Sequence, residues 1–88
     1  MSRRLGDILQ EAHETLNGDR AEEYGDPAEN FARAATIASE LLGRVIRPAD
    51  VVAVMVAVKL GRAARKPKRD TLVDAAAYLS IWYHLTPS

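Results

Sequence analysis

Residues 51–58 read Val-Val-Ala-Val-Met-Val-Ala-Val, and this apolar run decides the fold class. Its β-branched side chains would suit a buried strand. The chain has no second strand-like segment, however, and a lone strand would leave its backbone polar groups unpaired. Pro48 suits the first turn of a helix, and Asp50 suits its positive end. We therefore predict a helix from Pro48 that Pro67 bounds, and its uninterrupted apolar run should make it the central, most buried element.

Two helices are expected before this segment. Apolar residues recur at helical spacing through 3–16 and again through 27–42. The expected boundaries are Asn17 and Gly18 after the first helix, Asp26 as N-cap of the second with Pro27 and Glu29 completing a capping box, and Gly43 as its stop. Arg47 precedes a proline and should lie in an extended link over 44–47.

A fourth helix is expected over 69–85, and it carries two apolar stripes. One stripe suits the core of the chain itself. The second, formed by Ala75, Tyr78, Trp82 and Leu85, asks for another packing partner, for which a second subunit is the natural choice. Fifteen of the hydrophobic residues are alanine, so large core side chains are scarce. We predict an all-α, compact four-helix single domain over 1–88, assembled as a homo-oligomer.

Composition excludes several classes of function. The 88 residues contain no cysteine, which excludes a disulfide scaffold, a thiolate metal site and a cysteine nucleophile. No apolar run reaches the ~18–20 residues of a membrane span, and the first residues lack a signal peptide's apolar stretch. We therefore expect no membrane partner. The serines lack a nucleophile elbow, and the basic cluster at 59–69 lies at a helix end, which disfavours nucleic acid.

The candidate site combines charges from the last two predicted helices. Lys59 and Arg62 share one face of the third helix, and Asp70, Asp74 and Tyr78 share one face of the fourth, across a turn at Pro67. One interpretation is a salt-bridged hairpin end, with Asp70 also serving as a helix cap. The other is a pocket in which the bases hold phosphate and the acids orient a nucleobase or a metal.

The loop over 17–26 adds further candidates. Arg20 supplies a guanidinium, and Tyr24 could stack on a base or anchor the loop on the core. Asn30, near the start of the second helix, could cap that helix or contact a ligand. His13 and His84 are far apart in the sequence, so a metal site through them is not expected. Catalytic residues and metal ligands remain unassigned.

These residues carry a resemblance to a known family. The pattern runs over about 18–80 and consists of Arg20, Tyr24-Gly25-Asp26-Pro27, Asn30-Phe31, Pro48, Asp50-Val51, Met55, Lys59-Leu60, Arg62, Arg69-Asp70, Asp74 and Tyr78. It resembles a small phage and prophage domain family of unknown function. The resemblance implies an all-α fold and a bacteriophage source. Because the chain has no cysteine and so lacks the disulfides usual in small secreted folds, we expect an intracellular location, the cytoplasm of an infected bacterium.

A second resemblance is to MazG-like all-α NTP pyrophosphohydrolases, which hold Mg²⁺ around a triphosphate with two acidic pairs. Asp70 and Asp74 resemble the second pair, although they are four residues apart instead of three. The first pair would fall near Lys59 and Arg62, which are basic. An acidic motif is also matched in residue type by Glu22, Glu23 and Asp26. However, Gly25 and Pro27 place these acidic residues on a turn.

Three hypotheses follow for the function. The favoured one is a phage accessory protein that binds a nucleotide-like or phosphorylated ligand without turnover. In it Lys59 and Arg62 contact phosphate, Asp70 and Asp74 orient the ligand, and Tyr24 or Tyr78 stacks. The alternatives are a Mg²⁺-dependent nucleotide pyrophosphohydrolase of the MazG-like kind and a structural or host-protein-binding helical module. Whether the protein is an enzyme stays open, and Mg²⁺ enters only with the second hypothesis.

Overall fold

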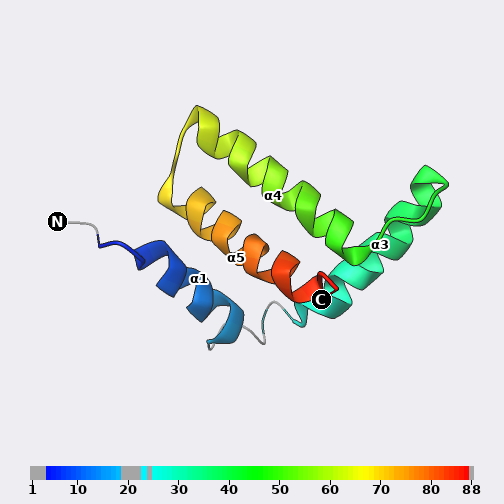
Figure 1. The fold of residues 1–88 in the computed structure, drawn as a ribbon, viewed down its shortest axis with the longest axis horizontal. Helices are drawn as coiled ribbons and strands as arrows, with labels where there is room; N and C mark the ends of the chain where they lie inside the picture. Colours follow the sequence, from blue (N-terminus) through cyan, green and yellow to red (C-terminus); the bar gives the residue numbers. More distant parts are fainter. Residues whose placement is uncertain (1–3, 19–22, 24, 88) are drawn as a thin grey trace.

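The computed structural model describes residues 4–18, 23 and 25–87, and the regular elements of this part are four α-helices (Figure 1). They are α1 (Asp7–Asn17), α3 (Pro27–Leu42), α4 (Pro48–Arg65) and α5 (Arg69–Leu85). No described residue lies in a strand. The all-α prediction is therefore confirmed, and the run at 51–58 is helical.

Local chemistry explains where α3 begins and ends. Asp26 is its N-cap, and the Asp26 Oδ1 accepts a hydrogen bond of 3.0 Å from the Ala28 backbone N–H. Pro27 occupies the first helical position, where its missing N–H costs nothing. Gly43 ends the helix at φ 68°, a left-handed conformation that glycine adopts without strain. The predicted bounds of 27–42 are confirmed.

The other helices agree with their predicted bounds except at one end. The last helix covers Arg69–Leu85 as expected, and α4 begins at Pro48, where the Arg47 N–H donates to the Asp50 Oδ2 at 2.9 Å. The first helix begins at Asp7 instead of residue 3. Its preceding residue, Gly6, has a φ of 93°, so the backbone before Asp7 is not helical.

The central helix is α5, which corrects the prediction that the 48–65 helix would be the most buried. α5 packs against α4, α1 and α3, and it contributes Val73, Ala75, Ala77 and Ile81 to the buried residues. α4 does bury Val52 completely, but its Val54 is 60% exposed. The apolar run is therefore covered on one side only, because α5 and α3 do not surround it.

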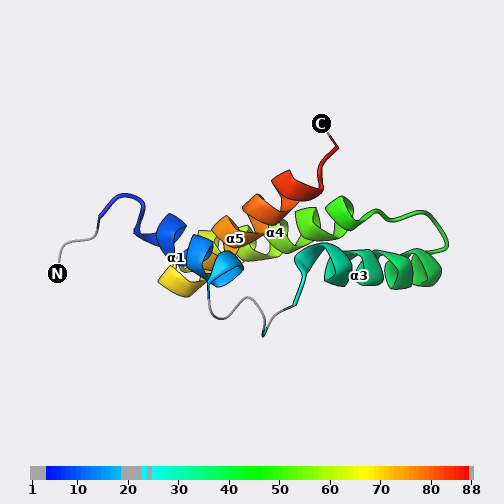
Figure 2. The same cartoon turned by 90° about the horizontal axis from the view of Figure 1, so that it is seen from below.

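The sequence predicted a compact molecule, but the observed molecule is elongated. Its principal extents are 50 × 31 × 26 Å, and its radius of gyration is 14.2 Å, against about 12 Å for an average compact chain of this length. Figure 2 shows the cause: α3 runs out past the end of the α4–α5 hairpin. Because α3 overhangs, Leu41 is 80% exposed.

The second stripe of α5 was predicted to face another subunit. Its residues differ in how far they are buried within the chain. Ala75 is buried within the chain. Tyr78 is half-buried, and its ring meets Phe31 of α3 edge to face, with 6.2 Å between centroids. Trp82 is 38% exposed. The helix start at 27 therefore supplies the partner that Tyr78 needs within the same chain.

Candidate functional site

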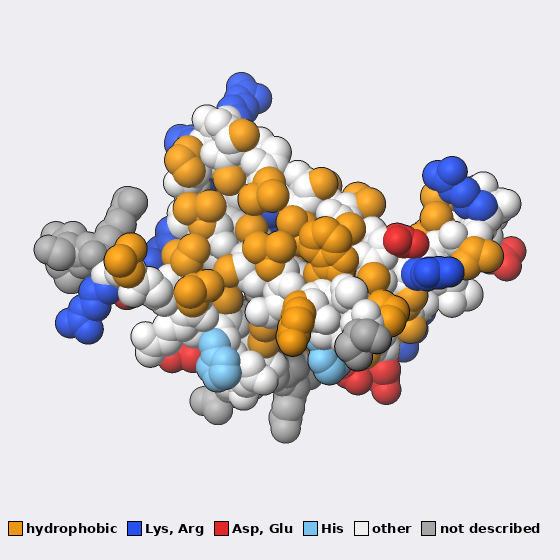
Figure 3. Space-filling model, in the orientation of Figure 1, with side chains coloured by type: hydrophobic (Ala, Val, Ile, Leu, Met, Phe, Trp, Pro, Cys, Tyr) orange, Lys and Arg blue, Asp and Glu red, His pale blue; other side chains and the backbone are white. Residues whose placement is uncertain are grey.

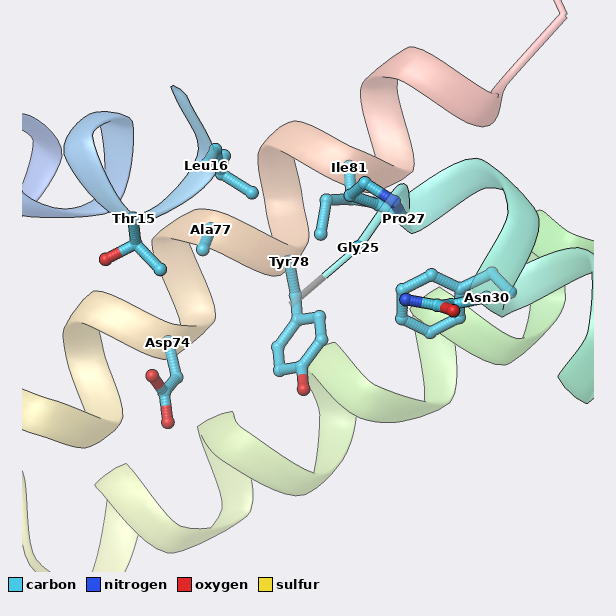
Figure 4. Close-up of a pocket in the computed structure, with 10 residues that line it drawn as sticks. Thr15, Leu16, Gly25, Pro27, Asn30, Asp74, Ala77, Tyr78 and Ile81 are labelled. Atoms are coloured by element: carbon cyan, nitrogen blue, oxygen red, sulfur yellow. The ribbon is translucent and has the colours of Figure 1, made fainter. Parts of the chain in front are cut away.

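A pocket opens where the end of α1 and the start of α3 meet the middle of α5 (Figure 4). Its volume is about 440 Å³. Most of the lining is apolar, and a few polar side chains converge on it, as is typical of small-molecule sites. The lining residues are Thr15, Leu16, Gly25, Pro27, Asn30, Phe31, Asp74, Ala77, Tyr78 and Ile81.

Asp74 is the acidic group of this pocket, and it also joins α5 to α4. The Asp74 Oδ2 accepts a hydrogen bond of 2.8 Å from the Lys59 Nζ. The Lys59 side chain is 16% exposed, and the Asp74 side chain is 50% exposed. The pair places a positive and a negative charge together at the edge of the pocket.

Two aromatic rings contribute to the wall. Tyr78 and Phe31 lie nearly perpendicular, with 81° between their planes. In Figure 4 the Tyr78 ring points from α5 toward α4, and the Asp74 carboxylate is turned toward the same side. Asp74 and Tyr78 are four residues apart on α5, so helical geometry sets them on one face. A ligand ring in the pocket would therefore meet an aromatic surface next to a carboxylate.

Thr15 and Asn30 complete the polar lining. The Thr15 Oγ1 donates to the Glu11 carbonyl oxygen at 3.0 Å, which leaves its oxygen lone pairs as acceptors. The Asn30 Oδ1 accepts from the Arg33 Nη1 at 3.5 Å, and Asn30 is exposed. These groups come from α1 and α3, so the polar lining depends on both helices packing against α5.

The structure brings half of the sequence-predicted site residues together. Asn30, Asp74 and Tyr78 line the pocket, and Lys59 is bound to one of them. Arg62 and Asp70 are exposed and do not line it. Asp70 is not the N-cap of α5 either, because Lys68 occupies that position and Asp70 lies in the first turn. Arg20 and Tyr24 lie outside the residues that the structure describes.

Sequence reasoning missed part of the lining. No ligand role was predicted for Thr15, Leu16, Ala77 or Ile81. Gly25, Pro27 and Phe31 belong to the pattern that carried the family resemblance, although no ligand role was assigned to them. The members of that pattern that line the pocket come from two segments, 25–31 and 74–78, and their convergence was the signal that could have found the lining.

Potential metal ligands do not form a cluster of three in the part of the chain that the structure describes. Within residues 4–18, 23 and 25–87, no three carboxylate or histidine side chains gather as potential metal ligands. Asp74 is paired with Lys59, and Glu22 of the proposed acidic motif lies outside these ranges. In the same ranges, no helix is long and apolar enough to cross a membrane.

Comparison with known proteins gives the family. Residues 7–86 match the model of a domain of unknown function, DUF6378. The chain is 38% identical over 76 residues to the Gene 55 protein of Mycobacterium phage L5, covering 84% of this chain and 49% of that protein. It is 36% identical over 72 residues to the Gene 55 protein of Mycobacterium phage D29, covering 81% of this chain and 48% of that protein.

The chain thus spans about half the length of the curated relatives that it matches. No solved structure matches it. The expected resemblance to a phage domain family of unknown function is confirmed, and nothing in these matches supports the MazG-like resemblance, which stays a prediction. The protein is a phage-type, all-helical chain that belongs to the DUF6378 family.

Proposed function

We propose that this chain binds a small nucleotide-like ligand, with the ring system in the pocket and the phosphate toward Lys59, and that it does so without turnover. One observation carries the proposal. The Asp74 carboxylate lines the pocket and at the same time holds the Lys59 ammonium at 2.8 Å. A hydrogen-bond acceptor for the ligand and a cation for its phosphate thus lie side by side.

The lining favours a flat, partly polar ligand. About 440 Å³ is within the range of roughly 300–1,000 Å³ that small-molecule pockets occupy. Tyr78 offers an aromatic face, and Leu16 and Ile81 add apolar wall. Asp74 can accept a hydrogen bond from an exocyclic amino group or a sugar hydroxyl. A nucleoside presents these features together, since it has a π-face, amino groups and hydroxyls.

Lys59 gives the phosphate a partner, but a partly neutralised one. An ammonium has three N–H donors, and Asp74 takes one of them. The Lys59 side chain is 16% exposed, so a ligand can reach the remaining donors only from the open side of the pair. Arg62, one turn further along α4, is the nearest additional base by helical spacing. Because Asp74 offsets the Lys59 charge, we expect the phosphate to add less affinity than the ring.

Binding experiments test this directly. Ligand-induced thermal shifts and heteronuclear NMR titrations should compare a nucleoside, its monophosphate and inorganic phosphate. Asp74→Asn keeps the shape but removes the charge, and it should weaken nucleoside binding about ten- to a hundredfold, the effect of roughly 1.5–3 kcal/mol for a charge-assisted hydrogen bond. Lys59→Met should remove the gain from monophosphate over nucleoside.

Two exposed neighbours provide matched controls. Asp70→Asn changes the same residue type one turn earlier on α5, away from the pocket, and it should leave binding unchanged. Arg62→Met controls for loss of a base on α4 and should reduce monophosphate binding only slightly. No binding of any nucleoside or monophosphate at millimolar concentration, or equal losses for Asp74→Asn and Asp70→Asn, would contradict the proposal.

The hydrolase alternative has a separate readout. Release of pyrophosphate from nucleoside triphosphates that depends on added Mg²⁺ would replace the binding proposal by an enzymatic one. The interaction-module alternative draws support from a different surface, the outer side of α4 and α5.

A further inference from the structure

An apolar surface covers the side of the α4–α5 hairpin that faces the reader in Figure 3, where hydrophobic side chains gather over both helices. We call it the outer face. Its principal members are Ala53, Ala57 and Leu60 of α4 and Leu79, Trp82 and Tyr83 of α5. Leu60 is 50%, Leu79 47%, Trp82 38% and Tyr83 86% exposed.

Helical spacing places these residues on one side of the hairpin. Ala53, Ala57 and Leu60 are separated by four and three residues, which aligns them along α4. On α5, Leu79 lies three residues before Trp82 and four before Tyr83, so the two rings flank Leu79 on one side of the helix. Figure 2 shows that α3 lies on the opposite side of the hairpin. The outer face and the pocket, whose walls include the start of α3, therefore occupy different sides of the molecule.

The outer face is free of charge in a chain of which 27% of residues are charged. Its size also exceeds what isolated surface residues produce. Trp82 and Tyr83 alone expose roughly 200–300 Å² at their observed fractions, taking about 150–250 Å² for a whole aromatic side chain. Monomeric proteins rarely show apolar patches beyond a few hundred Å². Two half-exposed leucines and the alanine row bring the face toward the ~800 Å² per partner of a standard interface.

We propose that a second copy of this chain covers the outer face and makes a two-fold dimer. On α4 the face has two small side chains, Ala53 and Ala57, followed by Leu60, and on α5 it has three large ones. A two-fold axis parallel to the helices would lay α5 of each copy over α4 of the other. Large side chains would then meet small ones twice, so the surface is complementary to itself.

The ion pair between the helices supports this register. Lys59 and Asp74 are in contact, so they mark the same level on two antiparallel helices. Trp82, eight residues after Asp74, therefore lies about level with Val51, eight residues before Lys59 and two residues from Ala53. Across the two-fold axis the same levels face one another. The indole of one copy would thus pack over the alanine row of the other.

A dimer of this kind would also add large side chains to a hydrophobic core that is small in the single chain. The buried side chains among the described residues are all alanine, valine or isoleucine. Two hairpins packed face to face form a four-helix arrangement that buries the leucines and the aromatic rings as well. The pocket, on the other side of each hairpin, would stay open to ligand.

Sedimentation equilibrium at micromolar concentration tests the proposal on the whole chain. The unmodified protein should give about twice its mass of 9.6 kDa. Ala57→Glu places a charge on an exposed alanine within a helix, where glutamate is a good helix former, so the fold should survive and the dimer should dissociate. Leu79→Lys should dissociate it for the same reason.

Mixing the two variants checks which helices meet. In a dimer with α4 over α5, the new carboxylate of one copy faces the new ammonium of the other, so the mixture should form a mixed dimer although each variant alone is monomeric. Circular dichroism confirms folding in each case. A mixture that stays monomeric contradicts the proposed pairing.

Val58→Glu is the matched control. Val58 is also an exposed apolar residue of α4, 42% exposed, but helical spacing turns it away from the outer face. Its substitution should leave the dimer intact. An unmodified protein that is monomeric at 100 µM, or a dimer that Val58→Glu dissociates and Ala57→Glu does not, would overturn the assignment.

Discussion

The Lys59 ammonium lies 2.8 Å from the Asp74 Oδ2, and the lysine is the more buried partner, with 16% of its side chain exposed against 50% for the aspartate. The asymmetry predicts unequal costs. Asp74→Leu strands a mostly buried ammonium and should lower the free energy of unfolding by about 1–3 kcal/mol. Lys59→Met leaves a half-exposed carboxylate that water can solvate, and it should cost under about 1 kcal/mol.

Urea denaturation of both single variants and of the double variant measures this difference. The double change to apolar residues should recover much of the Asp74→Leu loss, because no uncompensated charge remains. Equal costs for the two single variants would mean that the difference in burial has no energetic consequence.

The ion pair between Arg69 and Glu11 should contribute little to stability, because both of its side chains are about half exposed. Its atoms are also 2.8 Å apart, but the two side chains are 54% and 45% exposed. Glu11→Gln should therefore change the free energy of unfolding by less than about 1 kcal/mol. Raising the salt concentration to 1 M should abolish most of that difference, since the screening length falls to about 3 Å. A large, salt-independent loss would contradict this expectation.

The N-cap of α3 gives a third prediction. Asp26→Ala removes the acceptor of the Ala28 N–H and should cost about 0.5–2 kcal/mol in a thermal or urea denaturation experiment. Asp26→Asn should cost much less, because asparagine caps comparably. Equal losses for the two variants would show that the charge matters more than the cap.

Ser39 holds the link between α3 and α4, and this contact gives the fourth prediction. The Ser39 Oγ accepts from the Ile46 N–H at 2.8 Å. Ser39→Ala leaves this part-buried N–H without its partner and should cost about 1–3 kcal/mol. Thr36→Ala is the control in the same helix, because it also removes a hydroxyl, and the exposed Thr36 hydroxyl donates to the Ala32 carbonyl oxygen of its own helix. Comparable losses for both would contradict the role of Ser39.

The helix positions were predictable because their causes are local. Asp26-Pro27, Gly43 and Pro48 each act on the backbone within a turn, so the bounds of 27–42 and the start at 48 could be predicted from single residues. The predicted start of α1 was wrong because no strong cap precedes Asp7. The residue before it is a glycine, which has no side chain to cap the helix.

The candidate site was only partly predictable. Spacing of four on one helix correctly put Asp74 and Tyr78 on a common face. The pairing of Lys59 with Asp74, in preference to Asp70, depends on the antiparallel register of α4 and α5. Thr15 and Leu16 join the pocket only because α1 packs against α5, a contact that periodicity does not specify.

The sequence by itself determined that the chain is helical, where most helices begin and end, and which faces are apolar, because capping, proline and side-chain period act within a few residues. Only the tertiary structure decided which apolar face is covered. It made α5 central instead of α4, turned Tyr78 inward against Phe31 and left Trp82 at the surface. Burial depends on how whole helices pack against one another, and an 88-residue chain has too few helices to cover every apolar face that its sequence provides.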